Sequence, residues 1–287
     1  MYLATMTEEK RFEDKIKDDL IKSGFPLELK TSTILEENDW NVFPNEYVIE
    51  KDTGIEYEID IRALKSIKTQ TEDGNFQFLS FFNLIVECKK CEKHPWVFFM
   101  REKKFENPSR LIKHTHDFGI NRPYLCKGHN EVSNQVFFQK KIDYSKLNLF
   151  SGNERSTSYC QAFRDPNKEN QIYFAMRSVL RSLKILTTEQ HNHLSQGRFP
   201  EILLFTYIPI VVVDNNLFEG RLINGNLEIK ESKHIPLIIN INDKESDKAM
   251  IHIIKMDSLA EILIEVTKDM QILHNEFSKI SFIRNFK

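Results

Sequence analysis

The order of apolar and polar positions along the chain predicts both helices and strands. Apolar residues recur at three- and four-residue spacing in three stretches, as they do along the buried side of a helix. These stretches are residues 7–23, 171–184 and 258–277. In the first of them Phe12, Ile16 and Leu20 form the apolar stripe, and Gly24 follows as the residue that ends the helix.

Other stretches have the alternation or the continuous apolar character of strands. They are residues 47–50, 55–65, 76–90, 201–207, 209–214, 217–223, 227–231 and 250–255, with 27–34 as a further short extended segment. Turn residues at Asp52-Thr53-Gly54 and at Asn224-Gly225 join two pairs of them into hairpins. The elements predict one α/β domain over residues 1–287, with a central mixed sheet flanked by helices and residues 92–170 as an elaboration on this core.

Charged residues occupy defined positions on two of these strands. In the second arm of the first hairpin, the apolar residues at alternate positions are expected to share one face, with Asp60 on the other; they are Tyr57, Ile59, Ile61 and Ala63. The apolar run 76–90 is unbroken by charge until Glu87. Because side chains two apart on a strand share a face, Glu87 and Lys89 project together, while Cys88 points into the core.

Two carboxylates and a lysine at this spacing are typical of a hydrolytic site that uses a divalent metal ion. Mg²⁺ takes oxygen ligands and is commonly held by one or two carboxylates together with substrate phosphate. Such an ion polarises the phosphate and lowers the pKa of a bound water, while the ammonium group of Lys89 orients that water or offsets developing charge.

The helix with Glu13, the hairpin string IEYEIDIRALK (residues 55–65) and the strand string FFNLIVECKK (residues 81–90) resemble the PD-(D/E)xK nuclease superfamily. Ile59 precedes Asp60 where the family pattern has proline. The resemblance implies a restriction-endonuclease-like fold and Mg²⁺- or Mn²⁺-dependent phosphodiester hydrolysis.

The resemblance also implies a role for each motif residue. Asp60, Glu87 and the backbone carbonyl of Cys88 would be the metal ligands, Lys89 would position the attacking water, and Glu13 would be a supporting acid. The expected substrate is nucleic acid, DNA rather than RNA, in restriction, repair or anti-phage defence. A homodimer or an activating partner subunit is expected, since enzymes of this kind often cut two strands as dimers.

Composition agrees with a globular protein. Of 287 residues, 40% are hydrophobic and 22 are Phe, with no apolar run long enough to cross a membrane and no secretory leader, so we expect a cytoplasmic protein. Four cysteines in a chain of this length do not indicate a disulfide framework.

The net charge of −2 conceals an asymmetry along the chain. Residues 1–88 carry 10 basic and 19 acidic residues, whereas residues 89–185 carry 19 basic and 9 acidic ones. A basic middle region that begins at Lys89 suits a phosphate backbone. The candidate contacts to nucleic acid are Lys90, Lys93, Arg177 and Arg181.

Several other patterns allow different interpretations. Cys88, Cys91, Cys126 and His129 superficially have the spacing of a zinc site, which competes with a core position for Cys88. The cluster His114, His116 and Asp117, or the residues Gln161 and Arg164, could contact metal or phosphate. The alternative function is a non-catalytic subunit that binds nucleic acid or supports assembly and retains the nuclease fold; it has no need of Lys89 beside an acid.

Overall fold

The computed structural model describes residues 2–72, 74–91, 94–101, 119–120, 124–126, 146–149, 154–165, 170–196, 201–214, 216–240, 248–280 and 282–284. Within them, eleven strands form one sheet, in which ten follow the order β1-β2-β3-β8-β12-β11-β7-β4-β9-β10 and β5 pairs with β8. The strands are β1 (Asn41–Glu50), β2 (Ile55–Gln70), β3 (Gln77–Lys89), β4 (Trp96–Arg101), β5 (Gly119–Ile120), β7 (Arg155–Gln161), β8 (Ile202–Val213), β9 (Leu217–Ile223), β10 (Asn226–Glu231), β11 (His234–Asn240) and β12 (Lys248–Lys255). A separate pair joins β6 (Tyr124–Cys126) to β13 (Phe282–Arg284).

The part of the sheet that carries the candidate residues combines a meander with parallel strands. Strands β1, β2 and β3 are antiparallel neighbours, and β3 then pairs in parallel with β8, which pairs in parallel with β12. The helix α5 (Gln171–Gln196) precedes β8 in the chain and lies along one face of this region. The mixed α/β architecture agrees with the expectation from sequence.

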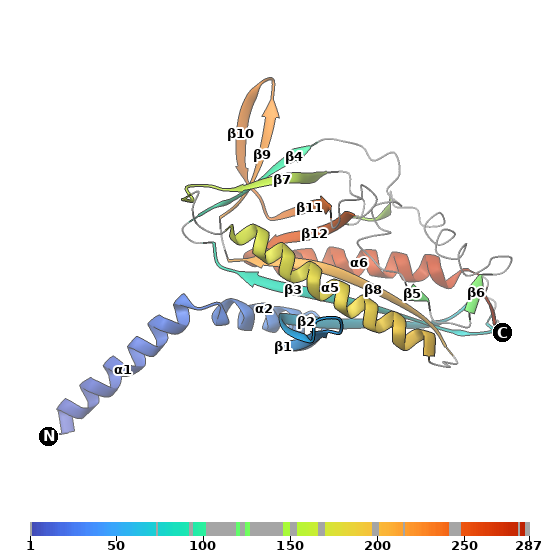
Figure 1. The fold of residues 1–287 in the computed structure, drawn as a ribbon, viewed down its shortest axis with the longest axis horizontal. Coiled ribbons are helices and arrows are strands. Elements are labelled where there is room, and N and C mark those ends of the chain that lie inside the picture. The colour runs from blue at the N-terminus through green and yellow to red at the C-terminus, as the bar shows by residue number, and fades with distance from the viewer. Residues whose placement is uncertain are drawn as a thin grey trace.

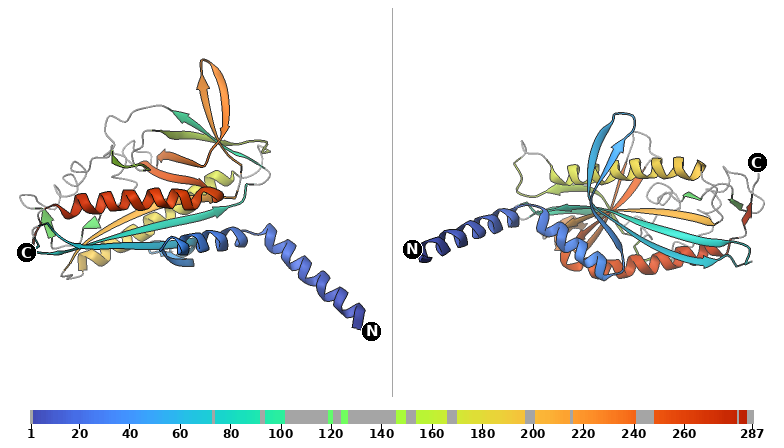
Figure 2. Two further views of the ribbon diagram at one scale, coloured as in Figure 1. Left: turned by 180° about the vertical axis from the view of Figure 1, so that it is seen from behind. Right: turned by 90° about the horizontal axis from the view of Figure 1, so that it is seen from below.

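Helices cover both faces of the sheet. Figure 2 shows α5 on one side, and α2 (Phe25–Glu37) and α6 (Leu259–Ser278) on the other. Strand β8 divides its side chains between the two layers: Ile210 and Val212 pack in the core beneath α6, whereas Val211 and Val213 pack in a core beneath α5. A near-continuous apolar strand is what burial on both faces requires.

Most predicted elements are present with longer bounds. The predicted helices correspond to α1 (Tyr2–Lys22), α5 and α6, and a short 3-10 turn over Met256–Ser258 precedes α6. Both predicted hairpins exist, as β1–β2 and β9–β10. The apolar runs 201–207 and 209–214 are one strand, β8, and the elaboration 92–170 contributes β4 and β7 to the same sheet.

The extended segment predicted over residues 27–34 was wrong, because these residues belong to helix α2. Leu27, Thr31 and Leu35 recur at four-residue spacing and are buried against the sheet, and Pro26 occupies the first turn, where its missing N–H costs nothing. The sequence does not show this helical pattern clearly, because the central residue of the buried stripe, Thr31, is polar and the apolar residue Leu29 is exposed.

Helix α1 is present as predicted, but the structure gives its apolar stripe no partner among the described residues. Phe12 is 66% exposed, and Ile16 and Leu20 are also exposed. Figure 1 shows the helix extending away from the sheet. The amphipathic spacing therefore predicted the helix correctly, but its apolar face is not buried.

Strand β2 does not keep its apolar residues on one face, contrary to the expectation. Ile61 and Ala63 pack in the core under α2 and α6, whereas Ile59 packs with Leu183 of α5. The change occurs at Asp60, which has no Cα partner in β1; the facing position, Asn45, has a left-handed φ of 52°. The β2–β3 ladder also begins only at Ile61. Asp60 thus lies where the strand departs from regular pairing.

Candidate functional site

The candidate site lies at the carboxyl end of β3, where the parallel strands β3 and β8 end beside α5. In open α/β sheets, this edge is where ligands commonly bind. The side chain of Glu87 is buried beneath α5, and its Oε2 accepts a hydrogen bond of 2.7 Å from Oγ of Ser178. Its Oε1 lies 2.5 Å from Nζ of Lys89. Glu87 and Lys89 therefore project together, as their spacing predicts.

Asp60 joins this edge from the neighbouring strand. Its Oδ2 accepts a hydrogen bond of 2.7 Å from the backbone N–H of Cys88. This bond takes the place of a ladder bond at the position where β2 and β3 separate. Since the N–H and C=O of one strand residue point to the same side, the Cys88 carbonyl is also directed toward Asp60. Among the described residues, Oδ1 of Asp60 has no hydrogen-bond donor.

The two carboxylates at this edge repel each other. Burial raises the pKa of Glu87, and the nearby charge of Asp60 raises it further, while Lys89 and Ser178 act in the opposite direction. Burial acts to lower the pKa of Lys89, but the charge and hydrogen bond of Glu87 together with the charge of Asp60 raise it overall. Two carboxylates thus lie near one another, and the one ammonium group beside them is paired with Glu87, which leaves excess negative charge.

A third acid, Glu28 on α2, belongs to this cluster and was missed from the sequence. Burial raises its pKa, as do the charges of Asp60, Glu58 and Glu87, while Lys89 lowers it. The resemblance assigned the helix acid to Glu13, but the structure does not bring Glu13 to the site: it is exposed on α1, which extends away from the sheet (Figure 1). A sequence signal for Glu28 was its position shortly before the hairpin, but residues 27–34 were expected to be extended and not helical.

The four candidate contacts to nucleic acid are placed as follows. Arg177 and Arg181 flank Ser178 on α5, with their guanidinium groups over the rings of Tyr173 and Tyr57 at 5.5 and 4.3 Å. Lys90 follows Lys89, and its Nζ donates a hydrogen bond to the carbonyl of Ile21 at the end of α1. Lys93 lies outside the described residues.

The structure separates two members of the alternative zinc quartet. The sulfur of Cys88 is in the core on the α2 side, 3.6 Å from Oγ1 of Thr31, as expected for a strand residue between Glu87 and Lys89. Cys91 packs in the other core, where its sulfur contacts Asp214. The side chain of Cys126, like His129, is outside the described residues. A tetrahedral site that uses both Cys88 and Cys91 is incompatible with this geometry.

The remaining candidates contribute nothing to the cluster in the described structure. Gln161 ends β7 and bonds to Gln171 at the start of α5, a contact of 2.9 Å that fixes the entry to the helix. Arg164 follows it in the connection to α5. The cluster of His114, His116 and Asp117 lies outside the described residues.

The donor set at the carboxyl end of β3 fits a hard cation such as Mg²⁺. It offers two carboxylates and a backbone carbonyl, and Mg²⁺ ordinarily keeps several waters and uses one or two protein carboxylates. Across the described ranges, no three His, Cys, Asp or Glu side chains are grouped as ligands of one ion. The groups that would hold such an ion are Asp60, Glu87 and the carbonyl of Cys88, together with water, and its charge would oppose the effect of Asp60 on the pKa of Glu87.

No protein-family model, curated protein or solved structure matches this chain. None of the helices that the structure describes combines the length and the apolar character needed to cross a bilayer.

Replacing Asp60 by asparagine is expected to stabilise the metal-free protein. The amide oxygen of the Asp60→Asn side chain would still accept the Cys88 N–H, while the charge that raises the pKa of Glu87 and Glu28 would be gone. The gain is about 1 kcal/mol, or roughly 2–4 °C in Tm, and it depends on the two glutamates being ionised. It should shrink as the pH falls and the two glutamates, whose pKa values are raised in the folded protein, take up protons.

Calorimetry with and without Mg²⁺ checks this expectation. The Tm of wild type should rise as Mg²⁺ is added, because the ion binds the folded state. The Tm of Asp60→Asn should rise much less. Asp52→Asn, an exposed change in the turn of the same hairpin, is the matched control and should leave both quantities as in wild type. A lower Tm for Asp60→Asn at neutral pH contradicts the expected charge repulsion, and an equal response to Mg²⁺ contradicts a role of Asp60 in holding the ion.

Proposed function

We propose that this protein is a metal-dependent nuclease with a restriction-endonuclease-like core, which hydrolyses phosphodiester bonds in DNA. The observation that carries the proposal is the hydrogen bond from the Cys88 N–H to Asp60 beside the Glu87–Lys89 ion pair. It brings two carboxylates, a backbone carbonyl and an ammonium group from two strands to one edge of the sheet. A scaffold protein has no evident need for that combination of groups.

Each group has a chemical task in this proposal. Asp60, Glu87 and the carbonyl of Cys88 would hold Mg²⁺ or Mn²⁺, which when bound polarises the phosphate and lowers the pKa of a water. Lys89 directs its ammonium group to the same place, where it orients the attacking water or offsets charge on the phosphate. Ser178 holds the carboxylate of Glu87 in position through its hydrogen bond.

The surface of α5 beside the cluster suits a nucleic acid backbone. Arg177 and Arg181 lie on either side of Ser178, and the exposed rings of Tyr173 and Phe174 lie one turn before it. Guanidinium groups contact phosphates without reading the sequence, and aromatic faces stack on bases. DNA as the substrate, and a role in restriction, repair or anti-phage defence, rest on the resemblance of the motifs.

The test is incubation of the purified protein with supercoiled plasmid and with single-stranded DNA, in the presence of Mg²⁺ or Mn²⁺ and in EDTA. We expect cleavage with either metal and none in EDTA. Binding of DNA without cleavage under every metal condition would favour the non-catalytic subunit instead. If the protein neither binds nor cleaves DNA, that result would contradict both functions.

A further inference from the structure

The hairpin β9–β10 projects from the body of the protein and leaves an open sheet edge. Figure 1 shows it extending beyond β4 and β7, and Figure 2 shows the same projection from behind. Within the described part of the chain, β10 pairs only with β9, so one side of β10 has no neighbouring strand. An edge of this kind is a template for pairing with another chain.

One face of the hairpin is apolar and exposed. Leu222 and Leu227 are directly opposite each other and are 74% and 58% exposed, and Ile229 on the same face is 50% exposed. A two-stranded hairpin is at best marginally stable by itself, whereas three or more strands with a shared apolar face are stable. Strand β4 pairs with β9 only as far as Gly220, so the outer part of the hairpin consists of two strands alone.

The turn determines which backbone groups face the open edge. Asn224 and Gly225 have φ values of 52° and 83°, the left-handed pair of a two-residue type I′ turn. In such a turn the flanking residues Ile223 and Asn226 are the first hydrogen-bonded pair, and bonded and non-bonded pairs then alternate. The N–H and C=O groups of Leu227 and Ile229 consequently point away from β9.

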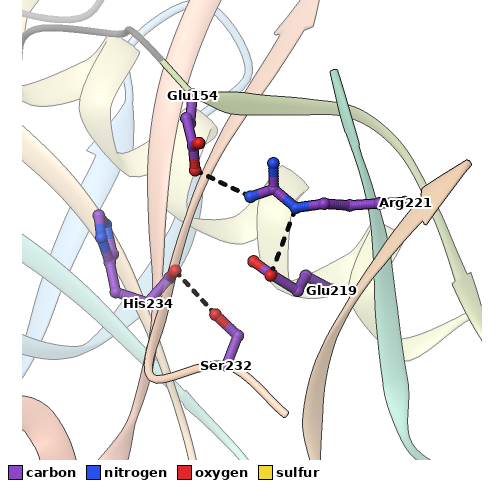
Figure 3. A network of polar contacts seen from close by, with 5 residues as sticks. All are labelled: Glu154, Glu219, Arg221, Ser232 and His234. Carbon is purple, nitrogen blue, oxygen red and sulfur yellow. Dashed lines mark hydrogen bonds and ion pairs between the residues drawn. The ribbon is translucent and has the colours of Figure 1, made fainter. Parts of the chain in front are cut away.

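The polar face of β10 carries two charges that the hairpin leaves without a partner. Glu228 is opposite Arg221, and Lys230 is opposite Glu219. Arg221 instead binds Glu154 at 2.8 Å and Glu219 at 3.4 Å, as Figure 3 shows. Neither Glu228 nor Lys230 forms an ion pair with any residue that the structure describes.

We propose that β10 pairs with β10 of a second copy of this chain, antiparallel about a two-fold axis at Ile229. In this register Ile229 is opposite its own copy, and its outward N–H and C=O form the central pair of hydrogen bonds. Glu228 of each chain is then opposite Lys230 of the other, and the two-fold symmetry makes two such ion pairs. The two hairpins become a four-stranded sheet with one continuous apolar face.

Charge complementarity selects this register over its neighbours. An axis at Glu228 would place two glutamates opposite each other, and an axis at Lys230 would do the same with two lysines. An axis between two residues would place apolar side chains opposite charged ones, because neighbouring residues of a strand lie on different faces. Only the register at Ile229 matches both faces of the strand near its centre.

The dimer is independent of the proposed nuclease function, since none of its residues belongs to the acid cluster. If both proposals hold, the two-fold axis relates two clusters, the arrangement needed to act on two antiparallel strands. The test below measures association alone, so failure of one proposal leaves the other standing.

Sedimentation equilibrium of the full chain tests the dimer. Wild type is expected to dimerise reversibly, while Glu228→Lys and Lys230→Glu each weaken the dimer about tenfold or more by creating like-charge pairs. The double variant E228K/K230E restores opposite charges and should return to within about threefold of wild type. Both side chains are exposed, so circular dichroism should be the same for all four proteins.

A cysteine pair tests the register. The Ile229→Cys variant should form an intermolecular disulfide under mild oxidation, since a hydrogen-bonded antiparallel pair has a Cα separation of roughly 5.5 Å, within the range of a disulfide. Leu227→Cys is the matched control, because Leu227 is opposite Glu231 of the other chain and not opposite itself. Both are made with Cys160→Ser, since Cys160 is exposed. A wild type that stays monomeric, a double variant that fails to recover, or equal crosslinking at 227 and 229 overturns the proposal.

Discussion

Replacing Asp60 or Lys89 by alanine is expected to lower the rate of phosphodiester cleavage by about 100-fold to 1000-fold. Asp60→Ala removes a carboxylate that would hold the metal and leaves the Cys88 N–H without its acceptor. Lys89→Ala removes the ammonium group 2.5 Å from Glu87. DNA binding should persist in both variants, because the arginines of α5 are unchanged. The rate is measured on plasmid with Mg²⁺, and binding with Ca²⁺ in its place.

The matched control is Lys68→Ala. Lys68 is exposed on the same strand as Asp60, eight residues further along β2. Lys68→Ala removes an ammonium group, as Lys89→Ala does, but far from the cluster. It should cleave at the wild-type rate. Equal cleavage by Asp60→Ala, Lys89→Ala and wild type would defeat the nuclease proposal, whereas loss of DNA binding in both alanine variants would indicate damage to the fold.

The pH profile separates a chemical role of Lys89 from a purely structural one. Lys89 lowers the pKa of Glu87, both by its charge and by its hydrogen bond, so the pKa of Glu87 should rise further in Lys89→Ala. A protonated Glu87 binds metal poorly. At a Mg²⁺ concentration below saturation, the activity of Lys89→Ala should therefore begin to fall at a higher pH than that of wild type as the solution is made more acidic.

The strand-borne part of the site could be predicted because it depends on local rules. The side-chain period of two on a strand places Glu87 and Lys89 together and Cys88 in the core, whatever the rest of the fold does. The apolar run before Glu87 marks a strand that is buried on both faces, and its end marks the edge of the core. The hairpin before it follows from turn residues that are recognisable from sequence.

The contacts between distant segments could not be predicted from the sequence. Ser178 reaches Glu87 across 91 residues of chain, and nothing in the spacing of either residue indicates it. The change of face at Asp60 depends on the left-handed backbone of Asn45 in the facing strand. The order in which β4, β7 and β11 extend the sheet is likewise a property of tertiary packing, because the pattern of each strand fits several positions.

The helix acid near Asp60 and Glu87 is on α2 and not on the helix with the clearer amphipathic pattern, because amphipathic spacing does not measure burial. The stripe of Phe12, Ile16 and Leu20 is the clearer helical pattern in the sequence, yet it is exposed. Helix α2 has the weaker pattern, since Thr31 interrupts its apolar stripe, and it is the one that packs on the sheet. The helix with the weaker amphipathic pattern is therefore the one that is packed on the sheet.

Replacing Glu28 by glutamine is expected to reduce cleavage about 10-fold to 100-fold, the usual effect of removing a carboxylate that supports the ligands of a metal. Burial and the charges of Asp60, Glu58 and Glu87 raise the pKa of Glu28, so this acid lies within range of the charges of both proposed ligands. Glu13→Gln should leave cleavage at the wild-type level, because Glu13 is exposed on the projecting helix α1.

Glu36→Gln is the matched control for Glu28→Gln, since Glu36 is exposed two turns further along the same helix. It should cleave as wild type does. Initial rates at several Mg²⁺ concentrations separate the causes: loss of Glu28 should raise the Mg²⁺ concentration needed for half-maximal cleavage, whereas general damage to α2 would lower the rate at every concentration. A loss of cleavage in Glu13→Gln but not in Glu28→Gln would return the supporting role to α1 and would require that helix to fold back onto the sheet when substrate binds.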